Sequence, residues 1–219
     1  MLKELKWTLF QKRYSLIVKQ ALKEGQIASI DDSIYDEMKD TYLFGFPANF
    51  MIRYLQEIGY PNHKCYDISR FSMLCLKDST WTKGTIKSLE ILYGKEAATH
   101  YWVERYGKVY DFGLTKDGMV FDRDLFYRLQ YVDETETIYE KREDHITRCD
   151  DISGMLGKKE DYLPGGAKRN DFLIMAMTIK PSIETSANDN LKQEWQKILN
   201  DMQFSSAERI RFTPYQKKM

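Results

Sequence analysis

Residues 100–111 read HYWVERYGKVYD, and this stretch decides the fold. Two runs rich in aromatic and β-branched residues flank Tyr106-Gly107, a pair typical of a tight turn between strands. The pattern therefore predicts an antiparallel hairpin. With a two-residue turn, His100 and Asp111 fall on one face as diagonal neighbours, roughly 7–8 Å apart between backbones. An imidazole and a carboxylate can meet at that spacing, whereas a three-residue turn would put them on opposite faces.

A cysteine stands where a polar loop is predicted to enter a helix. Residues 65–76 carry apolar side chains at helical spacing, and residues 60–64 before them are polar. Backbone N–H groups and the helix dipole at such a position favour the thiolate, the nucleophilic form of cysteine. Cys65 is therefore the candidate nucleophile. Cys75 lies on the apolar side of the same helix, so we expect it in the core.

The rest of the chain is predicted to mix helices and strands. The predicted helices span 2–24 (closed by Gly25), a short segment after Ser33, 47–58, 65–76 and a last one from Asn188. The predicted strands span 85–93, 98–105, 108–112 and 172–179, the last ending before Pro181. Residues 119–132 show no clean period, and the charged stretch 133–171 is expected to form loops and short helices.

Composition excludes several classes of function. Thirty-three basic residues balance thirty-three acidic ones, so the attraction on which nucleic-acid binding depends is missing and we expect no nucleic-acid partner. No stretch approaches the roughly 18 apolar residues of a spanning helix, and the N-terminus lacks the apolar core of a secretory signal, so we expect no membrane association. Three cysteines without paired spacing favour a reducing compartment, which makes cytoplasmic the expected location.

The cysteines and histidines do not predict a metal site. His145 and Cys149 are four residues apart, which suits one helical face, but no Cys-x-x-Cys pair accompanies them. Gly165-Gly166 follows a proline and is typical of a turn, because the flanking pattern of a phosphate-binding loop is missing. We therefore expect neither a metal nor a cofactor.

Three short motifs together resemble a known family. Cys65-Tyr66-Asp67 is similar to the Cys-x-Asp that opens the core helix of transglutaminase-like proteins, and residues 100–104 resemble their His-x-Trp-x-Glu strand. Val109-Tyr110-Asp111 resembles the strand that delivers the catalytic aspartate. The separations, 35 residues from the cysteine to the histidine and 11 from there to the aspartate, are in keeping with compact bacterial members. The resemblance covers about 60–115, roughly a quarter of the chain.

The resemblance implies an α+β fold of the papain-like (transglutaminase-like) kind, with a helical N-terminal layer packed on a central antiparallel sheet. The chain would be a single domain over 1–219, with a helical part at 1–60, the catalytic-type core at 61–115 and a C-terminal extension at 116–219. It also brings Cys65, His100 and Asp111 together, which their spacing alone does not show. In that arrangement His100 is the base and Asp111 orients it.

Activities in this superfamily include peptide cleavage, amide deamidation, transamidation and acetyl transfer, and the proposed thiol chemistry requires no cofactor. We therefore expect a thiol-dependent hydrolase or acyltransferase that acts on a peptide or protein amide. The alternative is a catalytically inactive member that binds a partner in a groove rich in aromatic residues, which make up 14% of the chain. The sequence predicts no oligomeric state.

Residues near the motifs supply candidate binding groups. Tyr60 and Asn62, in the loop before Cys65, and Trp102, beside His100, are the predicted binding residues. Gln56, Tyr60 and Asn62 are candidates to help the Cys65 N–H hold an oxyanion. Core packing of Trp102 against the sheet is the competing interpretation.

The chain departs from the family beside two of its motifs. Lys64 precedes the cysteine, where a small residue is usual, and Phe112-Gly113 follows the aspartate, where proline or a small polar residue is common. Glu104 is expected to be a solvated strand residue rather than a second acid, and His63 a solvated loop residue.

Overall fold

A computed structural model describes residues 16–59, 65–87, 90, 98–113, 117–130, 132–139 and 156–212. The chain divides into two compact units, one formed by residues 1–34 and 55–148 and the other by residues 35–54 and 149–219. The prediction of a single domain stays a prediction. The described residues do not include Tyr60, Asn62, His63, Lys64, His145 or Cys149.

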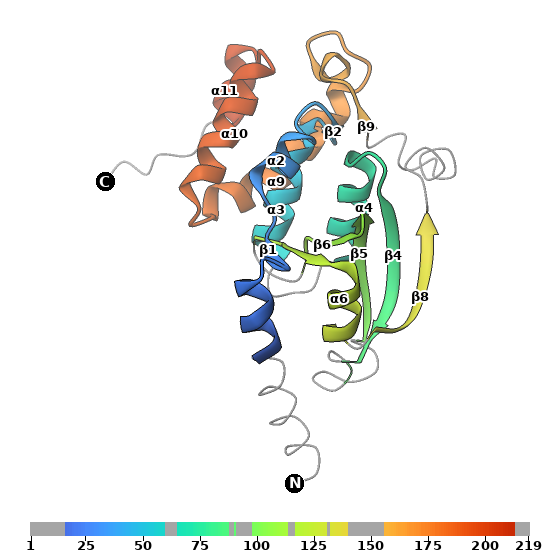
Figure 1. Cartoon of the computed structure of the whole chain (residues 1–219). Coiled ribbons are helices and arrows are strands. Elements are labelled where there is room, and N and C mark those ends of the chain that lie inside the picture. The colour runs from blue at the N-terminus through green and yellow to red at the C-terminus, as the bar shows by residue number, and fades with distance from the viewer. Residues whose placement is uncertain are drawn as a thin grey trace. The chain divides into compact units, whose positions relative to one another are not determined.

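The first unit is built on a six-stranded sheet (Figure 1). The strand order is β1 (Ile27–Ser29), β7 (Met119–Asp122), β6 (Lys108–Asp111), β5 (Thr99–Arg105), β4 (Thr80–Ile86) and β8 (Val132–Tyr139). Every neighbouring pair is antiparallel. The predicted α+β class with an antiparallel sheet is therefore confirmed.

The β5–β6 hairpin forms as predicted. Arg105 pairs with Lys108 across a two-residue turn, and Val103 pairs with Tyr110. The turn residues Tyr106 and Gly107 have φ values of 50° and 71°. Positive φ at both central positions matches the right-handed twist of the strands, which favours a two-residue hairpin loop.

Helices cover both faces of this sheet. Helix α4 (Cys65–Cys75) lies on the face that carries Trp81 and Tyr101, because Tyr66 contacts both rings at centroid distances of 5.2 and 5.0 Å. The opposite face carries Trp102, which packs on Phe126 of α6 (Arg123–Gln130) with 5.2 Å between ring centroids. Both predicted properties of α4, its extent and its buried Cys75, are confirmed.

The N-terminal part is helical with short strands between the helices. Residues 2–15 of the helix predicted at 2–24 lie outside the described residues, whereas residues 16–23 are helical and Gly25 ends the helix with a φ of 69°, as predicted. Helix α2 (Asp32–Asp36) and α3 (Ala48–Gly59) also match their predicted positions within one or two residues. The prediction of a helical part at 1–60 missed three short strands, because β1, β2 (Tyr42–Leu43) and β3 (Phe46–Pro47) lie between the helices.

Two predicted strands are wrong. Residues 88, 89 and 91–93 of the strand expected at 85–93 lie outside the described residues. Of the others, Thr85 and Ile86 end β4, which starts earlier at Thr80, and Lys87 and Glu90 are helical. The strand expected at 172–179 lies inside helix α9 (Arg169–Thr185). Its buried side chains recur every three or four residues, as a helix requires, and Pro181 lies inside the helix instead of ending it: Phe172, Ala176, Ile179 and Ile183.

The charged stretch 133–171 also differs from its prediction. Residues 132–139 form β8, at the edge of the sheet beside β4. Edge strands commonly carry charged residues, which blunt pairing with other chains, so the charge hid the strand. Helix α6 went unpredicted in residues 119–132, because only two turns of period were available there.

The second unit has a mainly helical and aromatic interior. It contains a small sheet, β3-β2-β9 with β9 at Leu156–Gly157, a 3-10 turn η2 (Lys159–Tyr162), and helices α9, α10 (Asp189–Asp201) and α11 (Ser206–Phe212). Trp195 stacks on Phe46 at 5.4 Å between centroids. The helix predicted from Asn188 is confirmed, and the Asn188 side chain caps it by accepting a hydrogen bond from the Leu191 N–H.

In the part of the chain that the structure describes, no helix is both long and apolar enough to cross a membrane.

Candidate active site

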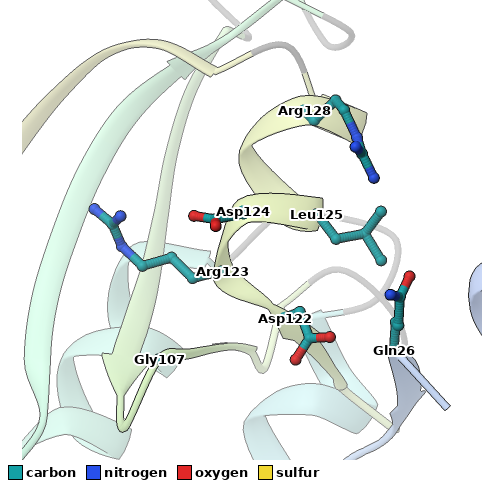
Figure 2. Close-up of a pocket in the computed structure, with 7 residues that line it drawn as sticks. All are labelled: Gln26, Gly107, Asp122, Arg123, Asp124, Leu125 and Arg128. Atoms are coloured by element: carbon teal, nitrogen blue, oxygen red, sulfur yellow. The ribbon is translucent and has the colours of Figure 1, made fainter.

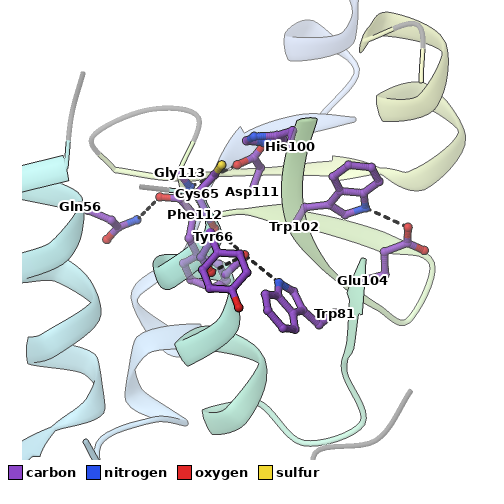
Figure 3. A network of polar contacts seen from close by, with 11 residues as sticks. Gln56, Cys65, Tyr66, Trp81, His100, Trp102, Glu104, Asp111, Phe112 and Gly113 are labelled. Atoms are coloured by element: carbon purple, nitrogen blue, oxygen red, sulfur yellow. Dashed lines mark hydrogen bonds and ion pairs between the residues drawn. The ribbon is translucent and has the colours of Figure 1, made fainter. Parts of the chain in front are cut away.

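Three elements of the first unit bring the predicted triad together (Figure 3). Cys65 is the first residue of α4, His100 is the second residue of β5, and Asp111 is the last residue of β6. His100 Nε2 lies 2.6 Å from Asp111 Oδ2. The Cys65 side chain lies beside the imidazole and contributes to the raised pKa of His100 (Figure 3). Since Nε2 is engaged by the carboxylate, Nδ1 is the ring nitrogen left to face the sulfur.

A turn at the end of β6 lies where the start of α4 approaches His100. Strands β5 and β6 are paired from Val103 opposite Tyr110 to Arg105 opposite Lys108, and after Asp111 the chain turns at Phe112-Gly113. Extending that register would put Gly113 opposite His100. The backbone instead bends, and the Gly113 N–H donates to Asp111 Oδ1 at 3.2 Å.

The first residue of α4 lies against this bend. A methyl group built on Gly113 would come within 3.0 Å of Cys65 Cα and 3.1 Å of its Cβ. Contacts this short are tighter than most real Cβ contacts, so a larger residue at position 113 would push on the backbone of Cys65 by a few tenths of an ångström. The sequence did not indicate this close approach.

Burial and charge act in opposite directions on His100. The exposed side-chain fraction is 6% for His100 and 0% for Asp111. Burial lowers the pKa of His100, but the Asp111 charge and hydrogen bond, together with Cys65, raise it from 6.5 to about 10. His100 is therefore an imidazolium at neutral pH, and a cation beside the sulfur favours the thiolate.

Hydrogen bonds order the first turn of α4. Ser69 Oγ donates to the carbonyl of Cys65, and Trp81 Nε1 donates to Ser69 Oγ at 2.9 Å. Ser69 and Trp81 are both buried. These contacts tie the backbone of the candidate nucleophile to strand β4.

Trp102 packs against His100 on the same face of the sheet. The indole is fully buried and stacks on the imidazole with 6.1 Å between centroids. Its contacts are those expected of core packing, and none of its surface is open to a ligand in this state. A direct binding role for Trp102 therefore stays a prediction, as it does for Tyr60 and Asn62.

Glu104 is a strand residue, as predicted, but it is less solvated than expected. Its side chain is 16% exposed and accepts from three donors, which compensate for the lost hydration. Trp102 Nε1 and Tyr127 Oη donate to Glu104 Oε1 at 2.9 and 2.6 Å, and Arg123 Nε donates to Oε2 at 2.6 Å. Glu104 thus fixes the indole that packs on His100.

Gln56 lies near the site, where its side-chain amide is hydrogen-bonded to the backbone. Its side chain is buried, and Nε2 donates to the Phe112 carbonyl at 3.0 Å. The contact holds the turn that follows Asp111. Its proximity to Cys65 in sequence was the only signal that pointed to it.

A pocket among the described residues lies away from the proposed triad. It has a volume of about 440 Å³ and is lined by Gly107, Gln26 and the first turns of α6 (Figure 2). Gly107 is at the hairpin turn, the end of the strands remote from His100 and Asp111. Charged side chains of both signs line it, and the proposed triad contributes none of them.

The described residues contain no cluster of three or more His, Cys, Asp or Glu side chains that could hold a metal ion. Comparisons of the chain with protein-family models, curated proteins and solved structures found no match.

Proposed function

We propose that the protein is a thiol-dependent hydrolase or acyltransferase that acts on a peptide or protein amide, and that its first unit has a papain-like fold. One observation carries the proposal. A buried His100–Asp111 pair, 2.6 Å apart, lies beside a cysteine at the start of a helix. Nucleophile, base and orienting acid in this order are the arrangement that acyl transfer through a thioester needs.

In the acylation step, the Cys65 thiolate attacks the amide carbonyl carbon and forms a tetrahedral intermediate. The Cys65 N–H, at the positive end of the helix dipole, donates to the oxyanion. The His100 imidazolium then gives its proton to the leaving nitrogen, the C–N bond breaks, and an amine departs. An acyl thioester on Cys65 remains.

In the second step, His100 is neutral and takes a proton from water or an amine. The acceptor attacks the thioester carbonyl, and the thiolate leaves. Water gives a carboxylic acid, and an amine gives a new amide. Asp111 does not exchange protons in this scheme: it holds the imidazole in one orientation and stabilises its cationic form.

The thiol chemistry also supports the proposed cytoplasmic location. Neither Cys65 nor Cys75 is in a disulfide, and a thiol nucleophile persists in a reducing compartment. The proposed partner is a peptide or protein amide, with neither nucleic acid nor membrane.

A peptide carrying an epoxide or vinyl sulfone tests the proposal. We expect the probe to modify Cys65 at neutral pH, with peptide mapping to locate the label, and Cys65→Ser to abolish it. Cys75→Ser is the matched control, because it removes a buried thiol of the same helix and should leave the labelling unchanged. Equal, slow modification of all three cysteines would contradict the proposal and favour a protein that only binds.

A further inference from the structure

The turn formed by residues 111–113, here called the site turn, touches both halves of the proposed triad. Its first residue, Asp111, holds His100, and its last residue, Gly113, lies against the backbone of Cys65. A hydrogen bond inside the turn, from the Gly113 N–H to Asp111 Oδ1, links the two. A shift of this turn would therefore move the carboxylate and the sulfur at once.

Gln56 fixes the site turn from α3. Its Nε2 donates to the carbonyl of Phe112, the middle residue of the turn, and both side chains are buried. Gly118 keeps this contact compact, since a methyl group there would lie 2.9 Å from Gln56 Nε2 and 3.3 Å from Phe112 Cα. A buried carbonyl that lost its donor would drive the turn to rearrange.

We propose that Gln56 and Gly113 are positioning residues of the thiol site: Gln56 sets the site turn, and Gly113 sets how close Cys65 stands to His100. The inference rests on the proposed function and deepens it. Neither residue needs to touch the substrate. Both act through the separation of sulfur and imidazole, and hence through the reactivity of Cys65.

Gly113→Ala tests one of the two residues. The new methyl group would crowd Cys65, whose backbone must give by a few tenths of an ångström. Because misplacing a reacting atom by about 1 Å costs about 100-fold in rate, we expect the second-order rate of Cys65 alkylation by iodoacetamide at pH 6.5 to fall about 3- to 5-fold.

Gln56→Met and Gln56→Glu test the second residue. Methionine keeps the side-chain length and removes the donor, so the alkylation rate should fall about 10-fold. Glutamate cannot donate to the Phe112 carbonyl when ionised, but it can when protonated. We therefore expect the rate of Gln56→Glu, relative to wild type at each pH, to recover as the pH falls. A residue with only a structural role would lower the melting temperature without this pH dependence.

Two control variants separate positioning from stability. Ser72→Ala removes a buried hydrogen bond of α4, from Ser72 Oγ to the Ile68 carbonyl at 2.7 Å. Gly107→Ala strains the hairpin turn, where φ is 71° and no atom is within 4 Å of an added methyl. Both should lower the melting temperature while leaving the alkylation rate of Cys65 within about twofold of wild type.

The outcomes distinguish the two proposals. If the peptide probe labels Cys65 selectively but Gly113→Ala and Gln56→Met, both folded by circular dichroism, alkylate at the wild-type rate, the positioning roles are wrong and the proposed function stands. If wild-type Cys65 is not labelled, the proposed function fails first. A slower alkylation rate in Gly113→Ala and Gln56→Met, with Ser72→Ala and Gly107→Ala near the wild-type rate, supports both the proposed function and the positioning roles.

Discussion

The two ends of the β5–β6 hairpin carry the same kind of contact in opposite surroundings. At the turn end, Lys108 pairs with Asp122, and the exposed fractions of the two side chains are 42% and 39%. At the other end, His100 pairs with Asp111, and the fractions are 6% and 0%. The turn end borders an open pocket, whereas the buried end is closed by the first turn of α4.

The comparison shows what burial does to an ion pair. Water screens the pair at the turn end, so it contributes about 0–1 kcal/mol to stability. The buried pair cannot exchange its partner for water, and each charge depends on the other. This dependence keeps His100 protonated at neutral pH and thus prepares the neighbouring sulfur for attack.

The largest effect is expected at Asp111. Asp111→Ala leaves a buried imidazole without its counter-charge and should reduce the free energy of unfolding by about 3–5 kcal/mol, measured by urea denaturation at pH 7. The double variant His100→Leu/Asp111→Ala should recover much of that loss, since it removes both polar groups. A loss below about 1 kcal/mol for the single variant would mean that the buried pair resembles the exposed one.

The next effect is a dependence on pH. The pKa of His100 is raised from 6.5 to about 10 in the folded protein, so its contribution to stability is complete below pH 6.5 and is lost as the pH rises through 10. Urea denaturation of wild type and His100→Gln at pH 6, 8 and 10 checks the sign. The difference between them should shrink as the pH rises, and a difference that grows would overturn the assignment.

An intermediate effect is expected at Glu104, between the two ends. Glu104→Ala removes the acceptor of Trp102 and Tyr127 and should cost about 1–3 kcal/mol in the free energy of unfolding. Cys65 alkylation should slow less than in His100→Ala, because the indole acts on His100 by packing alone. An unchanged free energy of unfolding would show that water replaces Glu104 without cost.

The smallest effect is expected at the turn end. Asp122→Asn should change the free energy of unfolding by at most about 1 kcal/mol, and the difference should disappear in about 1 M salt, where exposed charges are screened. Thermal or urea denaturation at low and high salt measures it. A loss as large as that of Asp111→Ala would erase the contrast between the two ends.

Local features of this site could be predicted from the sequence. The hairpin register depends on Tyr106-Gly107, and that register places His100 and Asp111 on one face. The helix that starts at Cys65 follows from apolar spacing within α4. The meeting of Cys65 with His100 is non-local, and only the resemblance predicted it.

The features that sequence missed depend on distant contacts. The close approach of Gly113 to Cys65 arises because α4 lies against it, and nothing near that position in sequence indicates this. The acceptor role of Glu104 depends on Arg123 and Tyr127 of a helix that was not predicted. The apolar run of α9 suited a strand as well as a helix, and tertiary burial of every third or fourth residue decided between them.

The most direct test is the rate of Cys65 alkylation at neutral pH in wild type and His100→Ala. The account predicts that Cys65 reacts about 100-fold faster in wild type, because the imidazole of His100 lies beside the sulfur and Asp111 orients it. Equal rates in the two proteins would contradict it.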